Sequence, residues 1–332
     1  MQILLTFDYE LFFGKSSGTI ENCMISPTKK LLQIAQKHKI PLCFFVDIGY
    51  YIKLKEFETN FPDLSKDREA FEKQIQEMVA LGHDVQLHIH PHWEKAEYHK
   101  QGWQIQTSHC YKLDDFEQEE AEKIIIKYKE ALDLLIQRKT HTFRAGGWCI
   151  QPFNRWVKTF RSLGIKIDSS VFPGAYIQSD NYQVDFRNAP QKDYYFFENA
   201  VEEENIQGSF LELPISEWYY SPFFYWRLYL LGKLFPSKHK MMGDGSFISQ
   251  GSRKWNSLTR YTWNHASIDG YFTEALNRIL KHKIKKKHTY FNLIGHPKGM
   301  TKYSLKKLDL FIEKNKKNHS FITFDHVLEN HF

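Results

Sequence analysis

Three histidines at alternating positions form the densest group of chemically capable side chains in the sequence, in the run His88-Ile89-His90-Pro91-His92. On a helical turn, His88 and His92 share a face and can bind one metal, whereas on a strand all three histidines share a face. Pro91 argues against a regular strand interior. Two imidazoles need a third, anionic ligand to leave an open position for water, so the run predicts a catalytic metal site.

Two carboxylates, Asp8 and Glu10, are the candidates for that anionic ligand. They follow a short apolar run, and residues two apart on an extended segment point to the same side. One carboxylate can then bind the metal while the other takes a proton from the attacking water. The competing interpretation is a strand-end carboxylate that nearby amides satisfy, but the histidines favour catalysis.

Further polar residues follow other expected strands. Arg144 precedes Gly146 and Gly147, and a guanidinium there can hold a carboxylate while the glycines let the backbone approach a substrate. His296 can act as a general acid near neutral pH, and Asp168 could orient its imidazole. The alternatives are a structural salt bridge for Arg144, a structural role for His296 and a turn at Asp168.

All these polar positions come directly after segments that we expect to be strands. The expected strands are 3–6, 42–46, 85–87, 142–143, 166–167, 210–213, 290–294 and 321–323, and the expected helices are 26–38, 67–81, 114–137, 152–163, 271–283 and 304–316. This alternation favours an α/β fold with a parallel sheet. In a parallel β/α barrel the carboxyl ends of the strands converge on one face, so the polar side chains can meet in space.

Composition limits the class of protein. The 332 residues have ordinary hydrophobic and charged fractions, which suits a globular chain. The net charge of +6 comes without a recognised nucleic-acid-binding motif, so we expect no nucleic-acid partner. The four cysteines lack paired spacing and residues 1–8 lack the features of a signal peptide, which together predict a cytoplasmic protein with reduced thiols. The oligomeric state is not readable from the sequence.

The stretch 218–235 is very apolar and aromatic, but it contains Pro222 and Arg227 and only just reaches the length that spans a membrane. We expect it to be part of a buried or interfacial insertion at approximately 215–268. Peripheral contact with a membrane or with a lipid-linked sugar is the second interpretation.

Five motifs in this order resemble those of the polysaccharide deacetylase family (NodB homology domain, carbohydrate esterase family four). They are Phe7-Asp8-Tyr9-Glu10, the His88 to His92 pair after Gly82-His83, Arg144-Ala145-Gly146-Gly147-Trp148, Ile167-Asp168-Ser169-Ser170 and Leu293-Ile294-Gly295-His296-Pro297. The resemblance implies a distorted, incomplete (β/α)7-type barrel with parallel strands, one domain over residues 1–332, and a divalent metal, with zinc as the first choice.

The resemblance also implies a catalytic role for each motif. Asp8 is the base, Arg144 orients Asp8, and His296 is the acid that protonates the leaving amine with support from Asp168. The segment from Gly146 through Gly147 to Trp148 binds the substrate, with a backbone amide there stabilising the oxyanion.

For the metal, the resemblance implies the ligands His88 and His92, with Glu10 as the third ligand and Asp8 as the alternative. Tyr9 stands where the family usually has a second adjacent acid, and Ile89 replaces a usual Ser or Thr.

The implied function is a metal-dependent deacetylase that removes N-acetyl groups from a sugar or polysaccharide precursor, in surface polysaccharide or cell-envelope glycan metabolism. An acetylated carbohydrate is the expected partner. The departures at Tyr9 and Ile89 motivate an alternative, a non-catalytic carbohydrate-binding or assembly protein on the same fold. A metal-dependent hydrolase of another amide is a further alternative.

Overall fold

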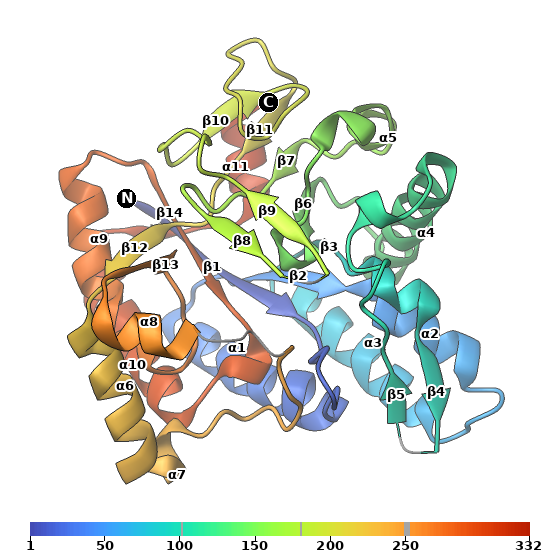
Figure 1. The fold of residues 1–332 in the computed structure, drawn as a ribbon, viewed down its shortest axis with the longest axis horizontal. Helices are drawn as coiled ribbons and strands as arrows, with labels where there is room; N and C mark the ends of the chain where they lie inside the picture. The colour runs from blue at the N-terminus through green and yellow to red at the C-terminus, as the bar shows by residue number, and fades with distance from the viewer. Residues whose placement is uncertain (101, 180, 249–252) are drawn as a thin grey trace.

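The computed structural model describes residues 1–100, 102–179, 181–248 and 253–332, and a curled β-sheet lies at its centre (Figure 1). In spatial order its strands are β10 (Tyr195–Phe197), β11 (Phe210–Glu212), β7 (Ile167–Asp168), β6 (Thr142–Ala145), β3 (Asp84–Ile89), β2 (Cys43–Asp47), β1 (Gln2–Tyr9) and β14 (Tyr290–Gly295), and β15 (Ser320–Phe321) also pairs with β1. Pairing is parallel from β11 to β14 and antiparallel between β10 and β11. The prediction of an α/β fold with a distorted, incomplete parallel barrel is confirmed.

Helices cover the outside of the curled sheet, which is why its central strands are buried on both faces. They are α1 (Ser26–His38), α2 (Ile48–Phe57), α3 (Leu64–Ala80), α4 (Gln118–Ile136), α5 (Val157–Ser162), α9 (Leu276–Lys285), α10 (Lys302–Asn315) and α11 (Phe324–His331). Every residue of β2, β3 and β14 is buried, as expected for strands with side chains packed on both faces.

Most expected helices are present, with shifted ends. The helix expected at 152–163 is a short 3₁₀ turn at Phe153–Arg155 followed by α5, and the one expected at 271–283 begins as a 3₁₀ segment at Gly270–Ala275. α2 and α11 were not expected. α2 starts directly after β2 with no turn residue between them. The sequence therefore shows no clear boundary between the strand period of two and the helical period of 3.6 residues.

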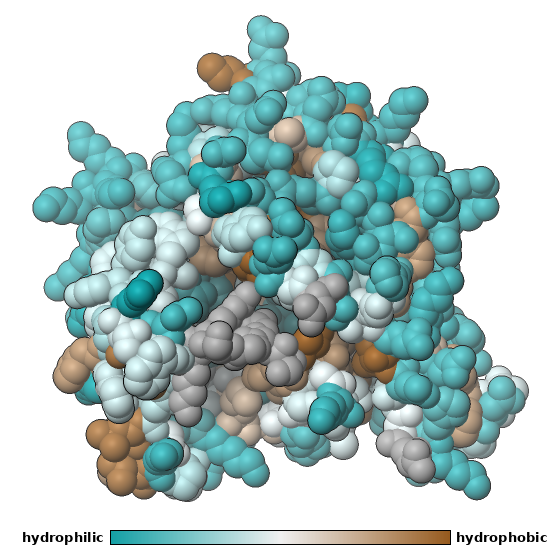
Figure 2. Space-filling view, in the orientation of Figure 1, coloured by the Kyte–Doolittle hydropathy of each residue, from teal (hydrophilic) through white to brown (hydrophobic). Residues whose placement is uncertain are grey.

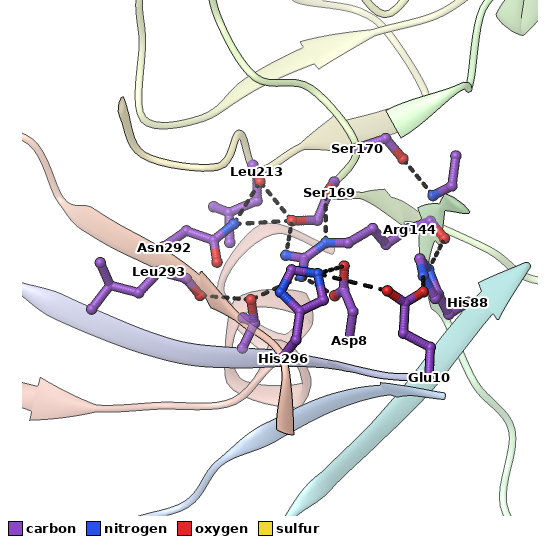
Figure 3. A network of polar contacts seen from close by, with 12 residues as sticks. Asp8, Glu10, His88, Arg144, Ser169, Ser170, Leu213, Asn292, Leu293 and His296 are labelled. Atoms are coloured by element: carbon purple, nitrogen blue, oxygen red, sulfur yellow. Dashed lines mark hydrogen bonds and ion pairs between the residues drawn. The ribbon is translucent and has the colours of Figure 1, made fainter. Parts of the chain in front are cut away.

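The curl is closed by polar contacts between β14 and the segment that follows β11. Ser216 donates its backbone N–H to the carbonyl of Asn292 at 2.9 Å. The Asn292 amide Nδ2 donates to the Leu213 carbonyl at 3.0 Å and to Ser169 Oγ at 2.9 Å (Figure 3). One buried side chain therefore joins three strand ends that lie far apart in the sequence.

Two small hairpins and one larger excursion extend from the barrel. The hairpins are β4 (Glu97–His99) with β5 (Gly102–Gln104) and β8 (Tyr176–Gln178) with β9 (Gln183–Asp185). The excursion begins with β12 (Glu217–Tyr220), continues through α6 (Pro222–Leu234), α7 (Pro236–His239) and α8 (Arg253–Thr259), and returns in β13 (Thr262–His265), which pairs with β12.

The excursion occupies most of the predicted insertion at 215–268, of which residues 249–252 lie outside the described residues. The alternative of a buried segment is wrong for α6, because Tyr225 is its one buried residue. Among the helices of the described ranges, none combines the length and apolar character needed to cross a membrane.

The closing contacts make Asn292→Ala a strongly destabilising change. Removing the amide leaves the buried Leu213 carbonyl short of a donor and opens a small cavity, so we expect the free energy of unfolding to fall by about 2–4 kcal/mol. Urea unfolding measures this loss. The surface variant Asn318→Ala is the control, and equal stabilities for the two variants would contradict the proposed closure.

Candidate metal and catalytic site

The carboxyl ends of the parallel strands bring five of the predicted site residues together around one cavity. Asp8 lies near the end of β1, His88 in β3, Arg144 in β6, and Glu10 and His296 directly after β1 and β14 (Figure 3). The cavity has a volume of about 590 Å³, and its floor includes both carboxylates and His88. The convergence expected from strand-end positions therefore holds.

Glu10, His88 and His90 form the group that could hold a metal ion. One ligand atom from each lies within 4.8 Å of the other two, and all three residues are buried. Glu10 Oε2 is 3.2 Å from His88 Nε2 and 2.6 Å from His90 Nε2. Two imidazoles and one carboxylate are a common catalytic ligand set that leaves an open position.

The expected ligand His92 is not part of this group. β3 continues as extended chain through His90, so His88 and His90 share a face, as the strand alternative for the histidine run foresaw. The 3₁₀ segment Pro91–Lys95 then turns His92 into an aromatic environment beside Phe13 and Trp93. Neither of its ring nitrogens has a hydrogen-bond partner among the described residues.

The imidazoles of the group are held so that Nε2 faces Glu10. His88 Nδ1 donates to the carbonyl of Arg144 at 2.7 Å, which leaves the lone pair on Nε2. The His90 ring lies against Gly146, where an added Cβ would come within 2.5 Å of Nδ1. Gly146, predicted to bind substrate, thus makes room for a metal ligand.

The electrostatics of the two imidazoles differ. Burial lowers the pKa of His90 to about 4, so that ring is neutral at neutral pH. Burial also opposes protonation of His88, but Asp8 and Glu10 outweigh it and raise the pKa of His88. A bound metal must displace that proton, which makes metal affinity depend on pH.

The remaining oxygen of Glu10 is taken by a cation. Lys298 Nζ lies 2.8 Å from Glu10 Oε1 and also donates to the Leu11 carbonyl. Burial raises the pKa of Glu10, but Lys298 and His90 outweigh it and hold that pKa well below its ordinary value. Oε2 is therefore left for a ligand, and the three donors fit a divalent metal bound by Glu10 through one oxygen.

Asp8 is held by Arg144, as predicted. Arg144 Nη1 donates to Asp8 Oδ1 at 2.7 Å and to Thr6 Oγ1 at 2.9 Å (Figure 3). Burial raises the pKa of Asp8, but Arg144 and then His88 outweigh it and lower that pKa below its ordinary value. Asp8 is thus an ionised carboxylate with one oxygen occupied by the guanidinium and the other facing the cavity.

His296 lies beside the two carboxylates at the same cavity. Its Nε2 lies 3.8 Å from Asp8 Oδ2 and 3.7 Å from Glu10 Oε1. Its Nδ1 contacts Asp269 Oδ2 at 2.7 Å, and its backbone N–H donates to the other oxygen of Asp269 at 2.8 Å. Burial lowers the pKa of His296, but Asp269 outweighs it, and the net shift is upward.

The prediction that Asp168 supports His296 is wrong, because Asp269 occupies that place. Asp168 accepts hydrogen bonds from the backbone and hydroxyl of Ser170 at 2.9 and 2.8 Å, close to its alternative interpretation as a turn residue. It also pairs with Glu212, whose pKa is raised well above its ordinary value by burial and then by Asp168. The two buried carboxyls occupy paired positions on β7 and β11, where a proton on Glu212 removes the repulsion between two adjacent charges.

Aromatic side chains form the upper walls of the cavity. Gly147 and Trp148, both predicted to bind substrate, line it and both have positive φ, 58° and 65°. A side chain at Gly147 would collide with Tyr111, which stacks on Tyr182 with ring centroids 4.4 Å apart. Phe13 and Phe247 line the cavity on other sides.

Sequence reasoning missed three site residues, for different reasons. The strand alternative for the histidine run included His90, but it placed His92 on the same face and so did not separate the two. Lys298 lies two residues after His296, in the 3₁₀ segment Pro297–Gly299. No local sequence pattern indicates that its side chain belongs to the site. Asp269 belongs to no expected strand and reaches His296 through a single bridge between Ser267 and Ile294.

Comparisons with solved structures agree with the fold. A protein from Mycobacterium smegmatis that carries the name polysaccharide deacetylase matches 99% of this chain and 89% of its own, with a TM-score of 0.51 and 16% identity. A CE4 family pseudoenzyme from Bacillus anthracis matches over 97% and 63% of the two chains, with a TM-score of 0.41 and 11% identity. A peptidoglycan deacetylase from Bacillus subtilis matches over 99% and 90%, with a TM-score of 0.37 and 10% identity.

No protein-family model matches the sequence, and no curated protein does. The similarity to the Mycobacterium smegmatis structure therefore rests on the fold, which confirms the resemblance to the polysaccharide deacetylases at that level. The chemistry has to be argued from the site.

The choice between His90 and His92 can be tested by metal affinity. His90→Asn removes one of three donors, so we expect the Kd for Zn²⁺ to rise roughly 100-fold or more, beyond the effect typical of a supporting residue. His92→Asn is the matched variant and should change Kd by less than about tenfold. Competition with a chromophoric chelator measures both, and the reverse order of effects would restore His92 as the ligand.

The carboxyl pair of Asp168 and Glu212 gives a pH-dependent prediction. The pKa of Glu212 in the folded chain lies well above the ordinary 4.5, so folding takes up a proton between these values. Wild-type stability then falls by about 1.4 kcal/mol per pH unit above 4.5, until the folded pKa is reached.

Glu212→Gln lacks this proton, so its stability relative to wild type should increase as pH rises through the same window. Urea unfolding at several pH values measures the difference. The surface variant Glu203→Gln is the control and should run parallel to wild type. A Glu212→Gln difference that stays constant with pH would contradict the proton on Glu212.

Proposed function

We propose that this chain, with its polysaccharide deacetylase fold, is a metal-dependent deacetylase that hydrolyses the acetamide of an N-acetylated sugar. The observation that carries the proposal is the convergence of Glu10, His88 and His90 at the floor of a cavity, between an ionised carboxylate and a histidine–carboxylate pair. Zinc is the metal that this donor set suits best, since it combines two imidazoles with a carboxylate.

Asp8 acts as the general base. Its free oxygen faces the cavity while Arg144 holds the other, so the carboxylate can take a proton from water without rotating away. A divalent metal held by Glu10, His88 and His90 would supply Lewis-acid polarisation of the acetyl carbonyl and acidify a water molecule.

His296 acts as the general acid beside Asp8. Its Nε2 points at the space above Asp8 and Glu10, and the bond to Asp269 fixes the ring with the proton-donating nitrogen toward the cavity. An imidazolium there can protonate the leaving amine. The base and the acid therefore lie side by side at the cavity, with Asp8 Oδ2 and His296 Nε2 3.8 Å apart.

The aromatic walls support a carbohydrate substrate. Trp148, Tyr111 and Tyr182 offer flat apolar faces, and the cavity of about 590 Å³ is within the usual range for small-molecule sites. Gln178, Ser179 and Asn181, around the β8–β9 hairpin, add polar groups at the rim. A sugar or polysaccharide precursor fits this mixture, while a cytoplasmic location stays a prediction.

One observation favours a second candidate, a carbohydrate-binding protein that does not use a metal. Lys298 already neutralises Glu10 in a buried contact at 2.8 Å, so a positive charge beside this carboxylate does not require an ion. Metal content separates the candidates, because the binding protein would purify without stoichiometric metal and would not take up Zn²⁺ tightly.

Replacement of the base tests the proposal. We expect Asp8→Asn to lower kcat for acetate release from N-acetylglucosamine oligomers by roughly 10²–10⁴-fold, because the attacking water loses its proton acceptor. Metal content should stay unchanged, since Asp8 is outside the ligand group. Enzymatic detection of acetate and elemental analysis provide the two measurements.

The controls are a surface variant and chelation. Asp63→Asn, with an exposed carboxylate, should keep wild-type activity. Chelator treatment should abolish acetate release, and added Zn²⁺ should restore it. Full activity in Asp8→Asn, or in the chelated protein, would remove the proposed mechanism.

A further inference from the structure

Helix α6 presents a continuous apolar stripe to solvent. Phe223, Trp226, Leu230 and Leu234 are 69%, 57%, 56% and 60% exposed, and their spacing of three or four residues places them on one face. Figure 2 shows hydrophobic side chains gathered at the lower left, where Figure 1 places α6 and α7. A helix that is apolar on nearly every side is normally buried.

The opposite face of α6 is firmly attached to the rest of the excursion. Tyr225 is buried, and its hydroxyl accepts a hydrogen bond from Thr262 Oγ1 at 2.8 Å. Phe224 packs against Tyr220 and Phe272, with ring centroids 4.7 and 5.4 Å apart. The helix is therefore held in place with its apolar stripe turned outward.

More exposed aromatic side chains lie near the stripe. Phe235 follows α6 directly and is 47% exposed, and Trp255 of α8 is 70% exposed. α8 packs on α6, where Trp226 Nε1 donates to the Leu258 carbonyl at 3.1 Å. Tryptophans with a hydrogen-bonded indole N–H and an exposed ring are typical of the boundary between water and lipid.

The charged side chains of the segment that carries the stripe have one sign. Residues 218–243 contain Arg227, Lys233, Lys238 and Lys240 and no aspartate or glutamate. All four of these side chains belong to exposed residues. A surface with apolar centre and cationic border is complementary to a layer that is apolar inside and anionic at its face.

We propose that α6 docks this protein on the surface of an anionic lipid bilayer. With 13 residues α6 is about 20 Å long, shorter than the roughly 30 Å hydrocarbon core, so it lies along the surface and does not cross it. The exposed rings and leucines enter the boundary between headgroups and acyl chains, and the four cations contact anionic headgroups.

A second copy of this chain fits the stripe less well. In a two-fold dimer the patch would meet itself, which places the cations of one copy near those of the other without any acid in 218–243 to pair them. The proposal is independent of the proposed deacetylase activity, since it concerns where the protein binds and uses no residue of the cavity floor.

Flotation with lipid vesicles tests the proposal. The wild-type protein should float with vesicles of phosphatidylcholine and phosphatidylglycerol and bind weakly to phosphatidylcholine alone. The triple variant Phe223→Ser, Trp226→Ser, Leu230→Ser should bind the mixed vesicles roughly tenfold or more weakly, because it loses most of the inserted apolar surface. Circular dichroism checks that the variant is folded.

A matched control removes exposed apolar side chains elsewhere. Leu134→Ser with Ile206→Ser alters residues that are 78% and 86% exposed, outside the excursion, and should bind like wild type. Charge reversal by Lys233→Glu with Lys238→Glu provides a second test that leaves the apolar stripe intact, and it should also weaken binding to the mixed vesicles.

Three outcomes would overturn the proposal. They are absence of wild-type binding to the mixed vesicles, equal binding by wild type and both α6 variants, or a wild-type dimer in sedimentation equilibrium that the triple variant disrupts while vesicle binding is absent. The last result would assign the stripe to a second copy of the chain. Acetate release from a soluble substrate should be unchanged in the α6 variants, which separates this test from that of the active site.

Discussion

The buried guanidinium of Arg144 is the contact on which the site depends. The guanidinium donates to Asp8 and Thr6 of β1 and to the backbone carbonyl and hydroxyl of Ser169. The backbone carbonyl of Arg144 accepts a hydrogen bond from His88 of β3. A fully buried cation is tolerated only when such partners surround it, and removing one partner of such a pair costs several kcal/mol. The same hydrogen bonds therefore support stability and site geometry, and they fix β1, β3, β6 and the end of β7 relative to one another.

The two carboxylates on the cavity floor are held by different cations. Glu10 is shared between Lys298 on one oxygen and the two imidazoles on the other, whereas Asp8 is shared between Arg144 and the open cavity. Each carboxylate thus keeps one oxygen for chemistry. Two acids two residues apart take different roles because different cations hold their other oxygens.

The sequence predicted site residues that lie at the ends of regular strands. It did not predict site residues that depend on contacts between segments far apart in the chain. The alternation of strands and helices predicted the parallel α/β fold, and the polar residues at strand ends predicted that Asp8, Arg144 and His296 meet, while the family resemblance supplied the incomplete barrel and the pairing of Asp8 with Arg144. His92 was chosen from the family resemblance, whereas the structure brings His90 to Glu10 because the chain stays extended through His90 before the 3₁₀ segment at Pro91–Lys95. Asp269 displaced Asp168 through a contact 27 residues away from His296, and no local pattern records such a contact.

The central claim is that a divalent metal binds between Glu10, His88 and His90. The most direct measurement is anomalous X-ray diffraction at the zinc absorption edge from crystals of the protein grown with Zn²⁺. The account predicts one strong peak within bonding distance of Glu10 Oε2 and of Nε2 on both His88 and His90. A peak bound by His92 in place of His90, or no peak beside Glu10 at saturating Zn²⁺, would contradict it.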